Sequence, residues 1–252
     1  MRGLALGALT GGLTACSSPS APSLTAASGS PSTAPSESPS PTLTSASPSP
    51  TGPLEDVVHG TSGRPEVALT FHGQGPASMA DDMLAICRAA GAAVTVFAVG
   101  QWVQENPELI RRVKAAGHDV GNHTWSHLDM PTMDEATATA EIVKGRDALA
   151  AVLGEAGPWF RPSATERSTP TIRAAAFAAG YERCISYDVD PEDFREPGAE
   201  VVRERVAATV RAGSIVSLHL GHQGTTEALP GILEDLAARG LRAVTLSTLL
   251  RD

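Results

Sequence analysis

Four of the seven histidines lie near the ends of apolar segments, where α/β proteins often place the residues that carry chemistry. His72 follows the run 67–71 and precedes a glycine-rich stretch. His219 lies near the end of another apolar run, and His123 and His127 follow a third. Imidazoles in such places are suited to proton transfer or to metal coordination.

Spacing alone leaves two interpretations of the pair His123 and His127, which are four residues apart. Two imidazoles that face one point just after a strand are a common start to a zinc or cobalt site. Two histidines four apart are also common on a solvated helix, where they bind nothing. For His219, the alternative to a functional role is a core histidine whose hydrogen bonds are satisfied.

The elements that must position these histidines alternate along the chain. Apolar, strand-like segments are separated by amphipathic segments of helical period, several of which end on glycine. This alternation predicts the α/β class, with a mostly parallel sheet or (β/α) barrel whose site lies in the loops after the strands. The predicted strands are 67–71, 93–100, 118–123, 159–162, 184–189, 214–220 and 242–246, and the predicted helices are 79–91, 106–117, 133–153, 170–180, 200–213 and 228–240.

The first quarter of the chain has a different composition. Residues 1–15 carry one positive charge and a short apolar run that ends at Cys16, which resembles a bacterial lipoprotein signal with Cys16 as the lipidated residue. An ordinary signal peptide with an incidental cysteine, or a mistaken start codon, is the alternative. Residues 17–53 are almost entirely Ser, Pro, Thr and Ala, which predicts a disordered tether.

We therefore expect a signal peptide at 1–15, a lipidated cysteine and linker at 16–57, and one folded domain at 58–252. A lipid anchor would place this domain on the extracellular face of the bacterial cytoplasmic membrane, facing the cell wall. The formal net charge of −9 and the lack of a Lys/Arg cluster argue against nucleic acid as a partner. Cys87 and Cys184 lie in apolar segments, which favours two buried thiols over a disulfide.

Several short motifs resemble, in their order and spacing, the polysaccharide deacetylase family with the NodB homology domain, carbohydrate esterase family four. They are GHDVGNHTWSH, FRP, YDVDPEDF, and GSIVSLHL followed by EALPGILEDLAARGLRAVTLSTLL, and the resemblance covers residues 64–250. It implies a distorted (β/α) barrel of the NodB homology type. It also implies a divalent metal, zinc or cobalt, held by an Asp and two His.

In that family the metal activates a water that attacks an acetamido carbonyl, which releases acetate and a free amine. The resemblance implies as substrate an N-acetylated sugar of cell-wall polysaccharide, peptidoglycan or a chitin-like oligosaccharide. On this mapping His123 and His127 match the metal ligands, and His219 matches the general acid. Asp190 or Asp193 matches the carboxylate region that orients this histidine.

Three further residues match parts of the family site. Arg161 matches the arginine that holds the catalytic carboxylate, and Phe194 stands where the family usually has a tryptophan pocket wall. Leu218, just before the matched general acid, is expected to line the same pocket. The motif after Arg161 departs from the family, because Ser, Ala and Thr at 163–165 replace the usual proline, aromatic and glycine.

The first motif differs from the family pattern more than any other motif does. The family has TFDDGP, in which the first Asp is the general base and the second is a metal ligand, whereas this chain has TFHGQGP. Both carboxylates are absent and the loop is one residue longer. The replacements are therefore either His72 and Gly73, or Gly73 and Gln74.

Three interpretations of His72 follow. It is a third metal ligand beside His123 and His127, or it is the general base while those two hold the metal, with the Gln74 carbonyl as a further ligand. In the third interpretation the site is inactive and the domain binds wall glycans. An O-acetyl esterase that uses the same site is a further alternative, because an alcohol leaves more readily than an amine.

Overall fold

The computed structural model describes residues 55–251. The predicted signal peptide, the lipidated Cys16 and the Ser/Pro-rich tether up to residue 54 lie outside the described residues. Among the helices of residues 55–251, none combines the length and the apolar character that a membrane crossing requires.

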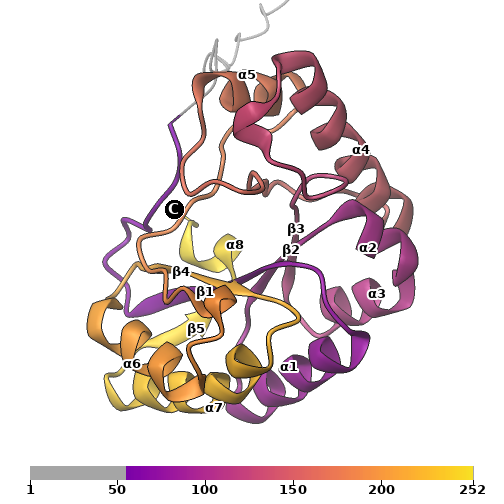
Figure 1. Cartoon of the computed structure of the whole chain (residues 1–252). Coiled ribbons are helices and arrows are strands. Elements are labelled where there is room, and N and C mark those ends of the chain that lie inside the picture. The colour runs from indigo at the N-terminus through magenta and orange to yellow at the C-terminus, as the bar shows by residue number, and fades with distance from the viewer. Residues whose placement is uncertain (1–54, 252) are drawn as a thin grey trace, which may run out of the picture. The chain divides into compact units, whose positions relative to one another are not determined.

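Five parallel strands form the centre of the domain (Figure 1). Four of them pair in the order β3-β2-β1-β4, and β5 pairs with the first half of β1. All residues of β1 are buried, which explains its nearly continuous apolar sequence, because a central parallel strand is covered on both faces. The strands are β1 Glu66–Gly73, β2 Thr95–Ala98, β3 Asp119–Asn122, β4 Ile215–His219 and β5 Arg242–Val244.

The strands predicted at 159–162 and 184–189 are reduced to single bridges. Phe160 bridges both Asn122 and Cys184, and Val189 bridges Val216, so that these contacts continue the sheet from β3 round to β4. Two physical causes shorten the strands: Pro162 has no N–H to donate, and the guanidinium of Arg161 takes the carbonyls of residues 185 and 186. The result is the distorted parallel barrel that the sequence predicted.

Helices surround the strands on the outside (Figure 1). Ser/Thr/Asp caps and prolines define several starts: Asp134 accepts from the Thr137 N–H, and Thr169 accepts from the Ile172 N–H. The short α2 was not predicted, because six residues that follow directly on a strand show too little helical period. The helices are α1 Ala77–Ala90, α2 Gly100–Glu105, α3 Pro107–Ala115, η1 Met130–Thr132, α4 Glu135–Leu153, α5 Pro170–Ala178, η2 Asp193–Arg195, α6 Ala199–Thr209, α7 Gln223–Ala238 and α8 Leu246–Leu249.

The folded domain begins slightly before the predicted boundary at residue 58. Val57 bridges Ile185, and its N–H donates to the carbonyl of Cys184 at 2.9 Å. The side chain of Asp56 accepts from the N–H of Ser168 at 2.7 Å. These long-range bonds make residues 56 and 57 part of the domain rather than of the linker.

The two cysteines within the described residues are buried free thiols, as predicted. Burial raises the pKa of Cys87 to about 12 and that of Cys184 to about 11. Both thiols therefore stay protonated and behave as small apolar groups.

A buried carboxylate stabilises the end of the barrel at which β1 begins. Glu66 is fully buried at the start of β1 and accepts hydrogen bonds from Arg64, Arg242 and Arg251 at 2.8–2.9 Å. Although burial opposes its ionisation, the hydrogen bonds from Arg64 and Arg251 outweigh this effect and hold the pKa of Glu66 below its ordinary value. The contacts join β1 to β5 and to the C-terminal end of the described chain.

Replacing Glu66 by glutamine is expected to lower the free energy of unfolding by about 2 kcal/mol at neutral pH, since hydrogen bonds to charged groups are lost. A folded-state pKa below the unfolded one means that the contribution is present above the unfolded pKa, about 4.3, and is lost as the pH falls through the folded pKa. Urea unfolding of both proteins at several pH values measures this difference. Asp81→Asn, at an exposed pair with Arg112, is the matched control and should cost less than about 1 kcal/mol at every pH.

Candidate active site

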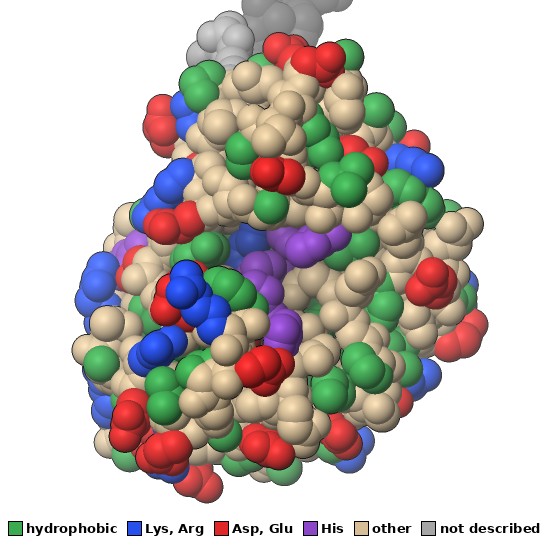
Figure 2. Space-filling model, in the orientation of Figure 1, with side chains coloured by type: hydrophobic (Ala, Val, Ile, Leu, Met, Phe, Trp, Pro, Cys, Tyr) green, Lys and Arg blue, Asp and Glu red, His purple; other side chains and the backbone are tan. Residues whose placement is uncertain are grey.

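The carboxyl ends of the parallel strands bring the predicted histidines together. His72 of β1 lies beside His219 of β4 in the sheet register, and His123 directly follows β3. Histidine side chains gather in a hollow of the surface between the upper and lower parts of the domain (Figure 2). The cavity there has a volume of about 340 Å³ and is lined by His72, His127, Arg161, Pro162, Ala164, Thr165, Glu166, Tyr187, Asp190, Phe194 and His219.

His72 and His123, the histidine pair, contact each other directly. The distance from His72 Nδ1 to His123 Nε2 is 3.2 Å. The other ring nitrogens also have partners: His72 Nε2 is 2.9 Å from Ser217 Oγ, and His123 Nδ1 is 2.8 Å from the carbonyl oxygen of Arg161. Both rings are therefore held in orientation by bonds on each side.

His127 lies beside this pair but is held differently. Its backbone is in the left-handed region, with φ of 57°, and its N–H donates to the hydroxyl of Thr124 at 3.2 Å. The ring centroids of His123 and His127 are 4.9 Å apart. These residues belong to the loop after β3, so the solvated-helix interpretation of their spacing is wrong.

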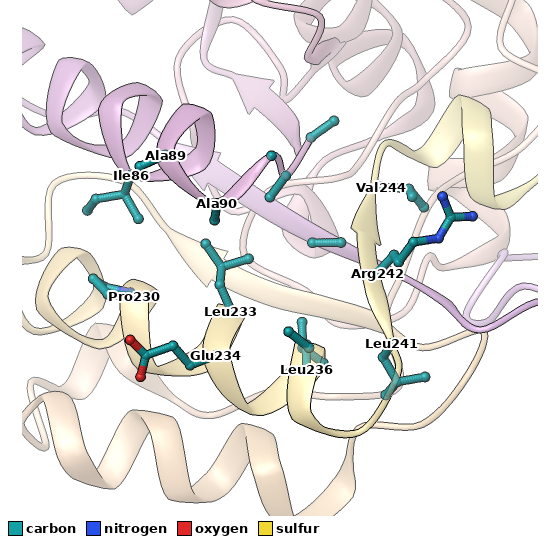
Figure 3. Close-up of a pocket in the computed structure, with 15 residues that line it drawn as sticks. Ile86, Ala89, Ala90, Pro230, Leu233, Glu234, Leu236, Leu241, Arg242 and Val244 are labelled. Atoms are coloured by element: carbon teal, nitrogen blue, oxygen red, sulfur yellow. The ribbon is translucent and has the colours of Figure 1, made fainter.

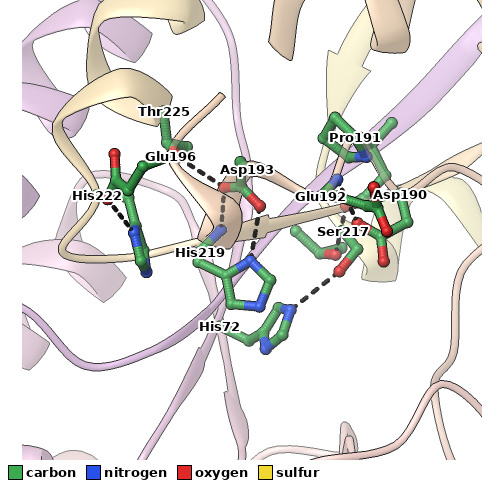
Figure 4. Close-up of polar contacts among 12 residues, drawn as sticks. His72, Asp190, Pro191, Glu192, Asp193, Glu196, Ser217, His219, His222 and Thr225 are labelled. Atoms are coloured by element: carbon green, nitrogen blue, oxygen red, sulfur yellow. Dashed lines mark hydrogen bonds and ion pairs between the residues drawn. The ribbon is translucent and has the colours of Figure 1, made fainter. Parts of the chain in front are cut away.

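His219 and Asp193, the acid pair, form the second part of the site (Figure 4). His219 Nδ1–H donates to one carboxylate oxygen of Asp193 at 2.7 Å, while the N–H of His219 and the hydroxyl of Thr225 donate to the other at 2.8 and 2.6 Å. Burial opposes ionisation of Asp193, but these hydrogen bonds outweigh it and the pKa lies below its ordinary value. The remaining ring nitrogen of His219 is Nε2.

Of the two carboxylates that the sequence left open, Asp193 is the one that orients His219. Asp190 lines the cavity, and its carboxylate accepts the N–H of Glu192 at 2.8 Å. Burial raises the pKa of Asp190 above its ordinary value. The surroundings of Asp190 and Asp193 therefore shift their pKa values in opposite directions, although the two residues are only three positions apart in the sequence.

Arg161 is 1 % exposed and forms none of the ion pairs found within residues 55–251. It donates to the carbonyls of Ile185 and Ser186 at 3.1 and 3.0 Å and to the hydroxyl of Thr70 at 2.8 Å. Its guanidinium also lies 4.5 Å from the ring centroid of Phe97. Burial lowers its pKa to about 9, so the group remains charged at neutral pH. The carboxylate partner of the family arrangement is replaced by neutral oxygens and aromatic faces.

The histidines near the guanidinium of Arg161 are kept neutral. Burial, and then the charges of neighbouring histidines and of Arg161, lower the pKa of His72 and of His123 well below the ordinary value. Burial and the charge of His219 lower the pKa of His127 as well. Neutral imidazole is the form that binds metal ions.

His72 Nδ1 and His123 Nε2 lie within hydrogen-bond distance of each other, and a metal site must be judged against that contact. The 3.2 Å between His72 Nδ1 and His123 Nε2 is close to the separation of about 3.3 Å expected for two nitrogens bound to tetrahedral zinc. The outer nitrogen of each ring has a hydrogen-bond partner, as in most metal-bound histidines. Within residues 55–251, however, no three His, Cys, Asp or Glu side chains are grouped to hold a metal ion. The metal centre of His72, His123 and His127 therefore stays a prediction.

Phe194 and Leu218 were both predicted to line the pocket, and only Phe194 does so. Phe194 lines the cavity, is 42 % exposed, and its ring centroid lies 5.1 Å from that of His219. The prediction for Leu218 was wrong: this side chain is fully buried in the main hydrophobic cluster. Successive residues of a strand point to opposite faces, so Ser217 and His219 face the site while Leu218 faces the helices.

The altered first motif has a defined register. β1 continues through Gly73, and His72 is the residue whose side chain enters the site. Gln74 is exposed beyond the strand. The loop then passes the loop after β4 so closely that a Cβ on Gly75 would lie 2.6 Å from the Cα of Gly221. Glycine at 75 thus sets the distance between the loops that follow His72 and His219.

Gly75→Ala is expected to destabilise the fold by about 1–3 kcal/mol, because overpacking against the Gly221 backbone forces the two loops apart. Thermal and urea unfolding measure the cost. Gly224→Ala is the control, since a Cβ there would meet nothing nearer than 3.7 Å. Equal stability of the two variants would contradict the close approach.

Several site residues were not predicted. Ser217 was detectable from the strand period, because it lies two residues before His219 and therefore on the same face. Tyr187 begins the quoted motif YDVDPEDF, although no role was predicted for it, whereas Glu166 and Thr225 come from a loop and a helix start that no sequence pattern marks. A second histidine–carboxylate pair, His222 and Glu196 at 2.5 Å, lies beside the acid pair (Figure 4).

A larger groove of about 760 Å³ lies between α1, α7 and β5 (Figure 3). Its walls are mostly Ala and Leu side chains, and its charged members, Glu234 and Arg242, are not part of a cluster suited to catalysis. We therefore assign the chemistry to the smaller histidine-lined cavity.

Known proteins resemble this chain over most of its folded part. A family model described as polysaccharide deacetylase matches residues 59–184. A peptidoglycan-N-acetylglucosamine deacetylase of Bacillus cereus is 32 % identical over 189 residues, which cover 73 % of this chain and 88 % of that protein. A chitooligosaccharide deacetylase of Bradyrhizobium is 32 % identical over 161 residues, which cover 64 % of this chain and 73 % of that one.

Solved structures agree with the fold. A mutant of BA3943, described as a CE4 family pseudoenzyme of Bacillus anthracis with restored enzymatic activity, superposes with a TM-score of 0.73 at 25 % identity. The match covers 78 % of this chain and 71 % of that one. The parallel α/β architecture and the matched sequence together place the chain in the polysaccharide deacetylase family.

Proposed function

We propose that the chain removes acetyl groups from N-acetylated sugars of a cell-wall glycan, either peptidoglycan or a chitin-like oligosaccharide. The observation that carries this proposal is that His219 of the acid pair and His72 of the histidine pair line the same cavity. The ring centroids of His72 and His219 are 4.0 Å apart. The names of the relatives, which act on N-acetylglucosamine in peptidoglycan or on chitooligosaccharides, support the choice of substrate class.

The acid pair supplies the proton that amide hydrolysis requires. An amine is a poor leaving group, so its nitrogen must be protonated as the carbon–nitrogen bond breaks. Asp193 holds Nδ1–H of His219 and stabilises the imidazolium, so that Nε2 can take the proton that the attacking water loses and give it to the departing nitrogen. The water oxygen ends in acetate, and the sugar keeps a free amine.

The histidine pair provides the electrophilic side of the cavity. A divalent cation, zinc or cobalt, held by His72 and His123 would polarise the acetyl carbonyl and make water more acidic. Arg161 carries a positive charge at the same wall, where negative charge develops on the carbonyl oxygen. Phe194 and Tyr187 offer aromatic surfaces against which a sugar ring can pack.

Acetate release from N-acetylated chitooligosaccharides and from peptidoglycan, measured with the full chain and added zinc or cobalt, tests the proposal. We expect acetate and free amine in equal amounts. Release of acetate from O-acetylated glycans alone would show that the site acts as an esterase and not as an amidase. No release from any acetylated glycan would remove the hydrolase proposal.

Glycan binding without hydrolysis is the second candidate. It is favoured by the loss of both first-motif carboxylates and by the absence of Arg161 from the ion pairs of residues 55–251. Saturable binding of N-acetylated oligosaccharides without acetate release would select it. Binding that disappears in Phe194→Ala would assign it to this cavity, because Phe194 is its partly exposed aromatic wall.

We also propose that the domain is anchored to the cytoplasmic membrane. A lipid on Cys16 would hold the domain at the outer face of the cytoplasmic membrane, with the cell wall within its reach. Radiolabelled palmitate should enter the wild-type chain and not Cys16→Ser. Labelling of both proteins, or of neither, would exclude this anchor.

A further inference from the structure

His222 and Glu196, the outer pair, lie beside the acid pair and have no part in the chemistry proposed above. His222 Nδ1 is 2.5 Å from Glu196 Oε1, and the ring centroids of His222 and His219 are 5.8 Å apart. Figure 4 shows the two histidine rings extending from the chain toward the same side. The outer pair thus repeats the histidine–carboxylate arrangement of the acid pair immediately next to it.

Two short turns place the outer pair. Only three residues lie between β4 and α7, and the middle one, Gly221, has φ of 84°, a conformation that glycine adopts readily. This turn brings His222 back beside His219. The turn η2 supplies both carboxylates, because it begins with Asp193 and is followed by Glu196, whose N–H donates to the carbonyl of Asp193 at 3.0 Å. One short turn therefore orients both histidines.

His222 differs from the other histidines of the site in its exposure. Its side chain is 28 % exposed, whereas His72 and His123 are buried. It lies just outside the cavity, because it is not among the residues that line it. Glu196 occupies Nδ1, and Nε2 forms no hydrogen bond within residues 55–251. This nitrogen is therefore available to a ligand at the edge of the cavity.

The chemistry of the outer pair suits a hydroxyl group. A carboxylate can only accept, so Nδ1 of His222 carries the proton that is donated to Glu196. Nε2 then accepts a hydrogen bond when the ring is neutral and donates one when the ring is charged. A sugar hydroxyl can take either role, so it is a partner for His222 in both protonation states.

The size of the cavity places a second sugar outside it. With a volume of about 340 Å³, the cavity has room for one N-acetylated sugar, so the next ring of a glycan must lie on the surface beside it. The outer pair lies about one sugar ring away from His219. In Figure 2, histidine side chains continue in a row out of the hollow, which shows that this edge is open at the surface.

We propose that the outer pair is a second sugar subsite, in which Nε2 of His222 binds a hydroxyl of the ring next to the acetylated sugar. Glu196 is the positioning residue that fixes the imidazole. The subsite makes the protein select glycan chains over single sugars. The inference rests on the proposed function for its class of ligand, and it adds which length of glycan the site recognises.

The test compares N-acetylglucosamine with tetra-N-acetylchitotetraose. Both are titrated into the ¹⁵N-labelled full chain without added divalent cation, and chemical shift changes give the dissociation constants. The wild type should bind the tetrasaccharide about tenfold more tightly or better, because rings outside the cavity add hydrogen bonds. His222→Ala should weaken tetrasaccharide binding about three- to tenfold, the value of one hydrogen bond, and leave the monosaccharide unaffected.

Two variants of Glu196 test its positioning role. Glu196→Ala should weaken tetrasaccharide binding about threefold, whereas Glu196→Gln should restore most of it, since the amide oxygen still accepts from Nδ1–H. Gln223→Ala is the matched control, because Gln223 is an exposed neighbour of His222 whose side chain is bonded to Glu227 on α7. It should bind both sugars as the wild type does. Circular dichroism confirms that each variant is folded.

Unchanged tetrasaccharide affinity in folded His222→Ala would overturn the inference. So would an equal loss for both sugars, which would place the effect inside the cavity, and so would a wild type that binds neither. Acetate release is measured separately and decides the proposed function. Hydrolysis that is indifferent to His222 keeps that function without the subsite, and selective tetrasaccharide binding without hydrolysis keeps the subsite alone.

Discussion

Asp193→Asn is expected to lower kcat/KM for acetate release about 100-fold or more, the usual contribution of a general acid. The carboxylate accepts three hydrogen bonds, two of them from His219. An amide has one acceptor oxygen and no charge, so it cannot stabilise the imidazolium that protonates the leaving amine. Steady-state acetate release from N-acetylated chitooligosaccharides measures the loss.

Asp190→Asn is the matched control for this prediction. Asp190 lines the same cavity, but its carboxylate is hydrogen-bonded to the N–H of Glu192 rather than to His219. Its replacement should cost less than tenfold. A larger loss in Asp190→Asn than in Asp193→Asn would exchange the roles of the two residues. Melting curves separate lost chemistry from lost folding, because Asp193 is buried.

His72→Asp is expected to strengthen zinc or cobalt binding tenfold or more. The substitution replaces a neutral ligand by an anionic one at the end of β1, which lowers the net charge of the bound centre. It also brings a carboxylate to the cavity wall that Arg161 shares, and this compensates a buried guanidinium whose acceptors are neutral. Competition with a chromophoric chelator measures the two dissociation constants.

His59→Asp makes the same charge change far from the site. His59 bridges Ser214 at the start of β4, whereas His219 is at its end, and its ring contacts the carbonyl of Ala212. This variant should bind cations as the wild type does. If His72→Asp binds no more tightly than His59→Asp, residue 72 does not face the cation and the histidine pair is not its seat.

The barrel could be predicted because its evidence is local and repeated. Strand-like and helical segments alternate, and parallel strands deliver the residues at their carboxyl ends to one rim. His72 and His219 accordingly lie side by side in the register. The segments 159–162 and 184–189 could not be predicted correctly, because the guanidinium of Arg161 in the first segment binds the carbonyls of Ile185 and Ser186 in the second.

The choice between Asp190 and Asp193 needed the three-dimensional structure. Both are acidic residues of one loop, and three residues of sequence cannot separate them. The turn η2 directs Asp193 to the N–H and the ring of His219, and it leaves Asp190 at the cavity wall. Leu218 shows the converse: we predicted it as a pocket wall from the family resemblance, although the strand period is sufficient to place it in the core.

Residue types and their order along the chain thus established the family, the parallel barrel and the histidines of the site, because motifs and periodicity are properties of neighbouring residues. Sequence also showed that both carboxylates of the first motif are absent, and the structure then showed that His72 is the residue that enters the site. The contacts of His72 with His123 and Ser217 depend on pairing between distant strands and loops. What His72 contacts depends on the distances between these strands and loops. Those distances are set by the folded chain and cannot be read from neighbouring residues in the sequence.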